Sequence, residues 1–318
     1  MVTFYILIFI VSCAVLFYSG KILIEALSRM ARFLGWREFV VAFIIIAFAA
    51  SIPNLFVGVT SALHGIPQLS FGDIVGGNLI DLTLAVALAA LFAKGLPAHS
   101  KMVQSSAMFT MAIAISPLLL ILDGSLGRGD GIFLILIFVL YVFWLFSKKE
   151  RFTKIYDSSK APVVRRFQNF IKDLGGVILG ILLLIGAAEG IVRAAHFFSE
   201  SFNLPLALVG ILVVGLGNSI PETYFAITAA RKANNWMILG DLMGSVIVAA
   251  TLVLGIVALI CPIEIEDFSP FAIARFFLII AAMFFLFFVR TDRKISTKEA
   301  FFLLGIYITF VIVEIFVK

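Results

Sequence analysis

The chain has 318 residues, of which 62% are hydrophobic and only 14% are charged, and its mean hydropathy is +1.15. A soluble globular protein of this length needs more polar surface, so the composition excludes that class and indicates a protein that crosses a lipid bilayer several times. The net charge of +5 would also suit nucleic-acid binding. However, the basic residues fall in short loops between apolar segments, which is typical of membrane topology, and we expect no nucleic-acid partner.

Ten apolar segments long enough to span a bilayer follow one another along the chain. The first has no basic residues ahead of it and no clear small-residue cleavage site, so we expect a retained helix instead of a signal peptide. Charged or Gly/Pro-containing breaks separate the segments. The predicted spans are residues 3–30, 38–63, 70–93, 101–122, 130–147, 174–199, 205–230, 236–262, 269–290 and 299–317.

The basic residues follow the alternation of loops that ten spans impose. Nineteen of the 24 Lys and Arg residues lie in the loops of one side, whereas only Arg128 and Lys318 lie in those of the other side. Because cytoplasmic loops are enriched in Lys and Arg, we predict a prokaryotic cell-membrane protein with both termini extracytoplasmic. Residues 148–173 form the predicted cytoplasmic loop, between a first half at 1–147 and a second half at 174–318.

Each half contains five predicted spans, and an odd number means that the second half is inverted in the membrane. When Ser51 is aligned with Ser219, 11 identical pairs match between 51–90 and 219–258 without a gap, including Pro53 with Pro221. We call this the repeat alignment. It predicts an all-α membrane protein whose ten transmembrane helices form two inverted five-helix repeats.

The first span of each half carries an opposite-charge pair at helical spacing. Lys21 and Glu25 are four residues apart, and the repeat alignment places Glu189 and Arg193 at the corresponding positions, with the signs exchanged. Such pairs lower the cost of burying either charge, so we interpret both as structural ion pairs.

A Ser-Ile-Pro sequence occurs in the second and the seventh span. Each proline removes an N–H group and frees the carbonyl oxygen four residues earlier, which at membrane depth needs a helix, water or a cation as its partner. A proline kink would explain one copy, but two copies in inverted halves favour a site for a hard cation. The candidate ligands are Ala49, Ser51 and Asn54 in the first copy and Gly217, Asn218, Ser219 and Glu222 in the second.

The third span places Asp73, Gly77 and Asp81 on one helical face, because they are four residues apart. An ionised aspartate in mid-bilayer costs several kcal/mol unless it is paired, so Asp81 is a candidate ligand. Asn78 lies beside this face, and Ser245 lies on the corresponding face of the eighth span. We expect Asp73 and its counterpart Asp241 near the span entrances, where they would attract cations or line access paths.

These features together resemble the alpha-repeats of the calcium/cation antiporter superfamily, especially its prokaryotic sodium/calcium exchangers. Both inverted halves have a Ser-x-Pro-Glu-like kink, followed by Gly-(Asn/Asp)-x-x-Gly-Ser-like residues, within 38–93 and 205–262. The resemblance implies that Na⁺ and Ca²⁺ compete for central sites, while the first helix of each half slides past the rest. Carried over by position, the implied ligands are Ser51, Asn54, Gly77 and Asp81, with Ser219, Glu222, Ser245 and Ala249.

The chain departs from that pattern at four positions. Asn54 stands where an acidic residue is usual, and Asp81 stands where asparagine is usual, so a carboxylate has moved from the second span to the third. Gly77 lacks a hydroxyl, and the Ala249 side chain cannot coordinate an ion. The expected central charge is about −2, which would neutralise one Ca²⁺ or two Na⁺.

The sequence therefore favours a secondary active antiporter that exchanges Na⁺ for Ca²⁺ by alternating access, for which a monomer is sufficient. Proton-coupled exchange of Ca²⁺ or another cation is an open alternative, because desolvation makes protonation of a carboxylate an alternative to a bound cation. A non-transporting membrane scaffold is another. An intramembrane aspartyl protease would need Asp73 and Asp241 to share a proton, and we expect them near opposite membrane faces.

The chain lacks the sequence signatures of an enzyme or a resident cofactor. No nucleophile triad, zinc-ligand spacing or phosphate-binding loop occurs in the sequence. Cys13 and Cys261 are interpreted as small buried hydrophobic residues. His64, His99 and His196 are isolated in the sequence, and we interpret them as loop or interface residues.

Overall fold

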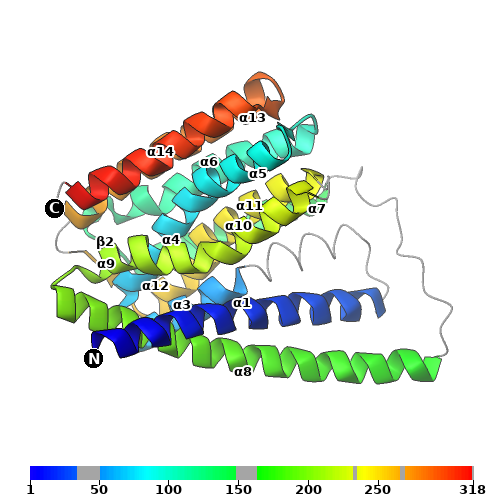
Figure 1. The fold of residues 1–318 in the computed structure, drawn as a ribbon, viewed down its shortest axis with the longest axis horizontal. Helices are drawn as coiled ribbons and strands as arrows, with labels where there is room; N and C mark the ends of the chain where they lie inside the picture. The colour runs from blue at the N-terminus through cyan, green and yellow to red at the C-terminus, as the bar shows by residue number, and fades with distance from the viewer. Residues whose placement is uncertain (34–50, 148–162, 232–234, 266–268, 317–318) are drawn as a thin grey trace.

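The structure, a computed structural model, describes residues 1–33, 51–147, 163–231, 235–265 and 269–316. Nearly all of these residues are helical, and the helices run along one direction as a bundle (Figure 1). The start of the first helix and the end of the last lie at the same end of this bundle. Which side of a membrane the termini face stays a prediction.

Nine helical segments of the described residues are long and apolar enough to cross a membrane. They correspond to nine of the ten predicted spans. The predicted span at 38–63 is described only in part, as the 12-residue apolar helix Ile52–Leu63, and its remainder lies outside the described residues. The number of ten spans therefore stays a prediction.

The first half consists, within its described residues, of α-helices joined by a π-helical segment, a 3₁₀ turn and short strands. In chain order they are α1 (Val2–Phe33), α3 (Ile52–Leu63), α4 (Pro67–Ile80), the π-helix η2 (Asp81–Ala85), α5 (Val86–Phe92), β1 (Leu96–Pro97), α6 (Lys101–Leu120), the 3₁₀ turn η3 (Ile121–Asp123), β2 (Ser125–Leu126) and α7 (Arg128–Ser147).

The second half repeats this order of long helices. Its elements are α8 (Val163–Phe202), α9 (Leu206–Val209), the π-helix η5 (Gly210–Val214), α10 (Gly215–Arg231), α11 (Asn235–Val248), the π-helix η6 (Ala249–Val253), α12 (Leu254–Ile260), β3 (Ile263–Glu264), α13 (Ser269–Thr291), β4 (Lys294–Ile295) and α14 (Thr297–Phe316). The bounds of α4, η2 and α5 coincide with those of α11, η6 and α12 in the repeat alignment.

The π-helical segments η2 and η6 interrupt corresponding helices at corresponding turns. Thr83 donates its hydroxyl to the carbonyl of Leu79, and Thr251 donates to the carbonyl of Ile247. A π turn breaks the regular ladder of backbone hydrogen bonds, and a threonine hydroxyl can bond to a carbonyl four residues earlier. The paired threonines of the sequence repeat therefore mark the same local irregularity in both halves.

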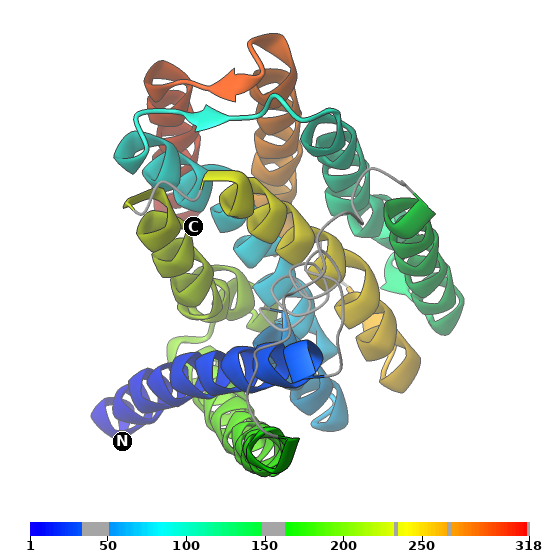
Figure 2. The same ribbon diagram turned by 90° about the vertical axis from the view of Figure 1, so that its right-hand side faces the viewer.

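Helices α1 and α8 lie side by side along one edge of the bundle (Figures 1 and 2). Their buried apolar residues belong to a hydrophobic cluster that also includes residues of α3, α4, α9 and η5, next to a larger core among the other helices. Arg29 Nε lies 2.7 Å from Asp173 Oδ1 near one end of the pair, and the rings of Tyr5 and Phe197 stack 3.9 Å apart near the other. These contacts tie α1 and α8 into one unit.

Helix α4 lies directly against the α9–η5 segment of the other half. A Cβ atom at Gly72 would lie 2.1 Å from the Ala207 carbonyl oxygen, and one at Gly76 would lie 2.3 Å from that of Ile211. Only glycine allows backbones to approach so closely. We call the contact of Gly72 and Gly76 with Ala207 and Ile211 the glycine seam.

Two antiparallel strand pairs also join the halves. In one, Leu96 of β1 pairs with Ile295 of β4, and in the other, Leu126 of β2 pairs with Ile263 of β3. The β1–β4 pair lies at the end of the bundle that faces the viewer in Figure 2, whereas β2 lies at the opposite end in Figure 1. At each end of the bundle, a short strand from the first half thus pairs with one from the second half.

Candidate cation site

The site is built where α10 crosses α4. The Nδ2 group of Asn218 on α10 donates to both carboxylate oxygens of Asp73 on α4, at 3.0 and 2.9 Å. One turn further along α4, a Cβ atom at Gly77 would lie 3.3 Å from the Ser219 hydroxyl. A Cβ atom at Gly215 would lie 3.1 Å from the Asp73 carbonyl oxygen. Small residues therefore bring the polar groups of the two helices together.

Asp81 is the first residue of η2, and residues of α10 and α11 face its side chain. The Ser245 side chain lies beside the Asp81 carboxylate, which also interacts electrostatically with Glu222 and Asp241. The interaction between these carboxylates is repulsive when both are charged, because they are like charges in a medium of low polarity. The predicted ligands Asp81, Glu222 and Ser245 thus meet in one place.

Four carboxylates, those of Asp73, Asp81, Glu222 and Asp241, form what we call the acidic cluster. Glu222 interacts electrostatically with the other three, and none of the four residues is more than 4% exposed. No Lys, Arg or His is among the buried residues of the described part of the chain. The acidic cluster therefore has twice the two carboxylates that the sequence predicts, and no basic side chain is buried with it.

Several oxygens of this region have no hydrogen-bond partner among the described residues. They are Asp81 Oδ1, Asn218 Oδ1, Glu222 Oε2 and, from α3, Asn54 Oδ1. A buried polar atom without a partner costs free energy, and a buried charged atom costs far more. Oxygens of carboxylates and amides are the ligands that hard cations such as Na⁺ and Ca²⁺ prefer. These oxygens are therefore of the chemical kind that cations prefer, although no three of the carboxylates are arranged to hold a metal ion in the described part of the chain.

Most of the remaining predicted ligands are buried as well. Ser219 and Gly217 are buried on α10, Asn78 is buried on α4, and Ser51 is buried at the start of α3. Ala49 lies outside the described residues. Pro53 is in the first turn of described helix α3, whereas Pro221 lies inside α10, so the predicted proline kink falls inside a described helix only in the second half.

Asp73 and Asp241 lie in the protein interior, because both are buried and both interact electrostatically with Glu222. Their expected positions near span entrances and opposite membrane faces stay predictions. Asp73 lies close to the start of α4, yet the glycine seam and α10 cover it. The glycines at 72 and 76 were the sequence signal for such close packing. A role in the access path stays a prediction.

One of the two predicted helical ion pairs is corrected. Glu189 and Arg193 form the expected pair on α8. On α1, however, Glu25 lies 3.7 Å from Arg29 instead of pairing with Lys21. Arg29 also contacts Asp173 across the helix pair, and that contact draws it to this side of α1.

Comparison with known proteins shows the family. The family described as sodium/calcium exchanger protein matches residues 4–147 and 172–316, which is most of the chain. The chain belongs to this family. It is therefore a multi-pass membrane protein of an antiporter family, and the two matched segments coincide with the two predicted halves.

Relatives of this exchanger-family chain cover most of its length. It is 27% identical to the inner membrane protein YrbG of Escherichia coli over 84% of this chain and 82% of that protein. It is 22% identical to the sodium/calcium exchanger MaX1 of Methanosarcina acetivorans over 100% of both. The solved sodium–calcium exchanger NCX_Mj, soaked with Na⁺ and Sr²⁺, has the same fold, with a TM-score of 0.68, 21% identity and coverage of 98% of this chain and 99% of that chain.

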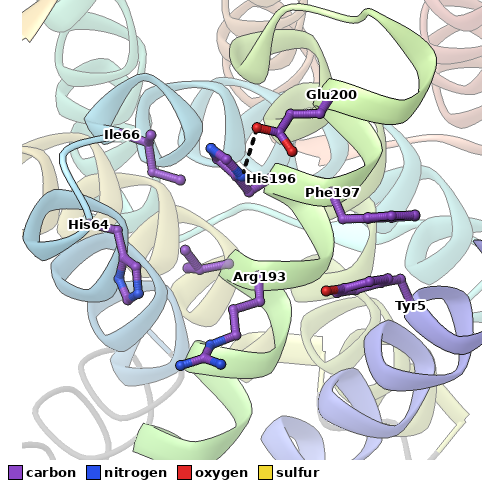
Figure 3. A pocket seen from close by; sticks show the side chains of 8 residues that line it. Tyr5, His64, Ile66, Arg193, His196, Phe197 and Glu200 are labelled. Atoms are coloured by element: carbon purple, nitrogen blue, oxygen red, sulfur yellow. Dashed lines mark ion pairs between the residues drawn. The ribbon is translucent and has the colours of Figure 1, made fainter. Parts of the chain in front are cut away.

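A second polar region of the exchanger lies apart from the acidic cluster, in a cavity of about 470 Å³ between α1, α3 and α8 (Figure 3). Glu189 binds Arg193 and lies 3.4 Å from His64 Nε2, and His196 lies 3.7 Å from Glu200. In the sequence His64 and His196 are isolated, but the packing of α3 on α8 brings them to one cavity. Among the described residues, no group of three acidic, His or Cys side chains is arranged to hold a metal ion.

Proposed function

We propose that this chain is a Na⁺/Ca²⁺ antiporter that works by alternating access, with the acidic cluster as its ion-binding centre. The observation that carries the proposal is a set of buried carboxylates with unpartnered oxygens and no buried basic residue among the described residues. A charged group in such a place needs a counter-ion. Transported cations supply that counter-ion, and no resident cofactor or catalytic group is needed.

The proposed ligands come from both halves. Asp81 and Glu222 provide charge at the centre, and amide, hydroxyl and backbone oxygens complete the coordination. Ca²⁺ takes six to eight such oxygens. The full proposed set is Ala49, Ser51, Asn54, Asn78, Asp81, Gly217, Asn218, Ser219, Glu222 and Ser245, with Asp73 and Asp241 adding negative charge or lining an access path.

Exchange of the two ions follows if the protein switches between its outward-open and inward-open states only when bound cations neutralise the acidic cluster. Either Na⁺ or Ca²⁺ removes the repulsion between Asp81 and Glu222, so either loaded state can move while the empty, charged state is held back. The two ions then cross in opposite directions on one site. A monomer contains all the proposed ligands, so the mechanism needs no second copy.

The proposed moving part is the α1–α8 unit. The contact of Arg29 with Asp173 and the stacked rings of Tyr5 and Phe197 hold the two helices together. Their apolar cluster extends to α3, α4, α9 and η5, and this is the surface along which the unit would slide. A Cβ atom at Gly217 would lie 2.9 Å from Cys13 Sγ, so α1 lies against α10 one residue from Asn218. A shift of α1 would therefore cover or uncover the ligands of α10.

The proposed architecture is two inverted five-span repeats, residues 1–147 and 174–318. The cytoplasmic segment predicted as a loop at 148–173 joins them, but its residues 163–173 are helical and form the start of α8. The recurrence of helix bounds in the repeat alignment and the strand pairs at opposite ends support this architecture. We further propose that both termini are extracytoplasmic in a prokaryotic cell membrane, because 19 of the 24 basic residues then face the cytoplasm.

Flux into proteoliposomes tests the function. We expect that an outward Na⁺ gradient drives uptake of radioactive calcium and that collapsing this gradient stops it. Uptake driven by a pH gradient in the absence of Na⁺ would instead establish the proton-coupled alternative, which the buried carboxylates also allow. If neither gradient moves calcium, the calcium assignment is wrong. A cation-dependent shift in thermal stability separates a transporter from the scaffold alternative, which predicts no such shift.

A further inference from the structure

The hydrogen bonds between Asp73 and Asn218 determine which end of the Asn218 amide is available to an ion. An asparagine side chain has a donor nitrogen and an acceptor oxygen, and a carboxylate can only accept. Because Asn218 Nδ2 donates to both oxygens of Asp73, its Oδ1 must face away from Asp73. That Oδ1 atom is buried and has no hydrogen-bond partner among the described residues.

The free oxygen lies on the side of α10 that carries Glu222. Residues four apart share a helical face, so Asn218 and Glu222 project to the same side of α10. Glu222 Oε2 is also buried without a partner in the described part of the chain, and its carboxylate interacts with that of Asp81. An amide oxygen and two carboxylates therefore converge in the acidic cluster.

We propose that Asp73 is a positioning residue, which holds the Asn218 amide so that its Oδ1 binds the transported cation. The proposal rests on the proposed function, and it deepens it by giving Asp73 a role other than an access path. Asp73 can hold the amide firmly because α4 is fixed: the glycine seam places Gly72, its chain neighbour, against the Ala207 backbone. Asp73 and Asn218 are each 2% exposed, so water does not compete for their hydrogen bonds.

The sequence repeat supplies a matched control. Asp241 is the counterpart of Asp73 in the other half and belongs to the same acidic cluster. The counterpart of Asn218 is Ala50, which has no amide. Asp73→Asn and Asp241→Asn therefore remove equal charge from the cluster, but only the first variant loses a group that orients an asparagine.

The experiment measures the apparent KM for Ca²⁺ in Na⁺-driven uptake and, independently of transport, the Ca²⁺ concentration that half-maximally stabilises the purified protein against heat. We expect Asp73→Asn and Asn218→Ala each to raise both values by about tenfold or more, the usual cost of losing a group that orients a metal ligand. Their double variant should bind Ca²⁺ no worse than the weaker-binding single variant, because both changes remove one oriented oxygen. When Asp241→Asn is combined with Asn218→Ala, the two fold-losses of Ca²⁺ affinity should instead multiply, because Asp241 does not orient Asn218.

Two results would overturn the proposal. In the first, the losses of Ca²⁺ affinity caused by Asp73→Asn and Asn218→Ala multiply in the double variant. In the second, Asp73→Asn and Asp241→Asn reduce Ca²⁺ affinity equally, which would make Asp73 a source of charge only. If a single variant folds poorly, the double variant Asp73→Asn with Asn218→Asp, in which the two residues are exchanged, tests the proposal instead. It again joins an amide to a carboxylate and presents an oxygen to the cluster, so we expect Ca²⁺ affinity near that of the unaltered protein. A loss of about tenfold in this folded variant would contradict the proposal.

Failure of the proposed function gives a different pattern. If the unaltered protein moves no calcium under a Na⁺ gradient, that function is wrong, yet Ca²⁺-dependent stabilisation still tests the role of Asp73. If neither Ca²⁺ nor Na⁺ stabilises the unaltered protein, Asn218 Oδ1 binds neither ion and the inference fails with it.

Discussion

Two acidic regions of this exchanger-family protein differ in how their carboxylates are neutralised. At the cavity between α1, α3 and α8, Glu189 and Glu200 are at least partly exposed and each contacts a basic side chain. In the acidic cluster, the four carboxylates are buried, and Asp73 accepts its hydrogen bonds from a neutral amide. The same residue types thus meet opposite conditions within one bundle.

The difference shows which carboxylates the protein neutralises permanently. An exposed ion pair is screened by water and is worth little, so it can persist in any state of the protein. A buried carboxylate without a basic partner is costly until a cation or a proton arrives. Under the proposed function, the acidic cluster is therefore the region whose energy would depend on bound ions, whereas the cavity carboxylates contact basic side chains.

The largest expected effect comes from Glu222→Gln. Glu222 interacts with all three other carboxylates, so its removal takes charge from the middle of the acidic cluster. We expect Na⁺-driven calcium uptake to fall to the level of protein-free vesicles. Glu264→Gln is the matched control, because Glu264 is exposed on β3, and it should transport normally. Unchanged uptake by Glu222→Gln would remove this residue from the mechanism.

The second prediction moves a carboxylate from one position of the interior to another. Asp81→Asn should strongly reduce uptake, because it removes a charge that interacts with Glu222. Asn54 on α3 has a buried Oδ1 without a partner among the described residues. We therefore expect that adding Asn54→Asp to Asp81→Asn restores much of the uptake. The placement of charge in the site is misjudged if the double variant is no better than Asp81→Asn.

A smaller effect tests the packing that holds the acidic cluster in place. Gly72→Ala puts a methyl group onto the Ala207 carbonyl, and such overpacking costs about 1–3 kcal/mol of stability. Gly305 on α14 is exposed and has no heavy atom within 4 Å of a Cβ position among the described residues. Gly305→Ala should therefore leave the unfolding temperature unchanged or raise it, since alanine is the better helix former. Thermal unfolding in detergent compares the two, and equal losses would argue against the glycine seam.

The smallest effect is expected at the cavity. Glu189→Gln breaks the contacts with Arg193 and His64, but the Arg193 side chain is 69% exposed. Exposed pairs contribute about 0.2–1 kcal/mol, so stability should change by no more than that and calcium uptake should persist. Loss of uptake in this folded variant would contradict the distinction between the two acidic regions, because it would make the cavity part of the ion pathway.

The sequence predicts much of this molecule because membrane spans and internal repeats leave strong local patterns. The charge distribution and the repeat alignment follow from residue type and spacing alone, and the meeting of Asp81 with Glu222 in one site is what the family resemblance implies. The Asp73–Asn218 bonds do not, because they join different halves, and Asn218 aligns with Ala50 instead of with another asparagine. An alignment of the halves compares equivalent positions and says nothing of such crossed contacts.

Other features escaped prediction because they depend on neighbouring helices. The burial of Asp73 is decided by α9 and α10, and the pairing of Glu25 with Arg29 accompanies the approach of α8. The π-helical turns have no simple hydrophobic period, although Thr83 and Thr251 mark them in both halves. Tertiary packing, which a periodic pattern does not encode, settles these details.

The glycine seam has a consequence for how such sequences diverge. At Gly72 and Gly76 the two halves meet through main-chain atoms, and main chains are the same in every sequence. Apolar side chains elsewhere in the bundle can be exchanged for others of similar volume at little cost. This contact between the two halves therefore depends on the two glycines and otherwise on main-chain atoms, which most substitutions leave unchanged. We expect related sequences to vary widely at apolar surface positions and to vary little at these two glycines.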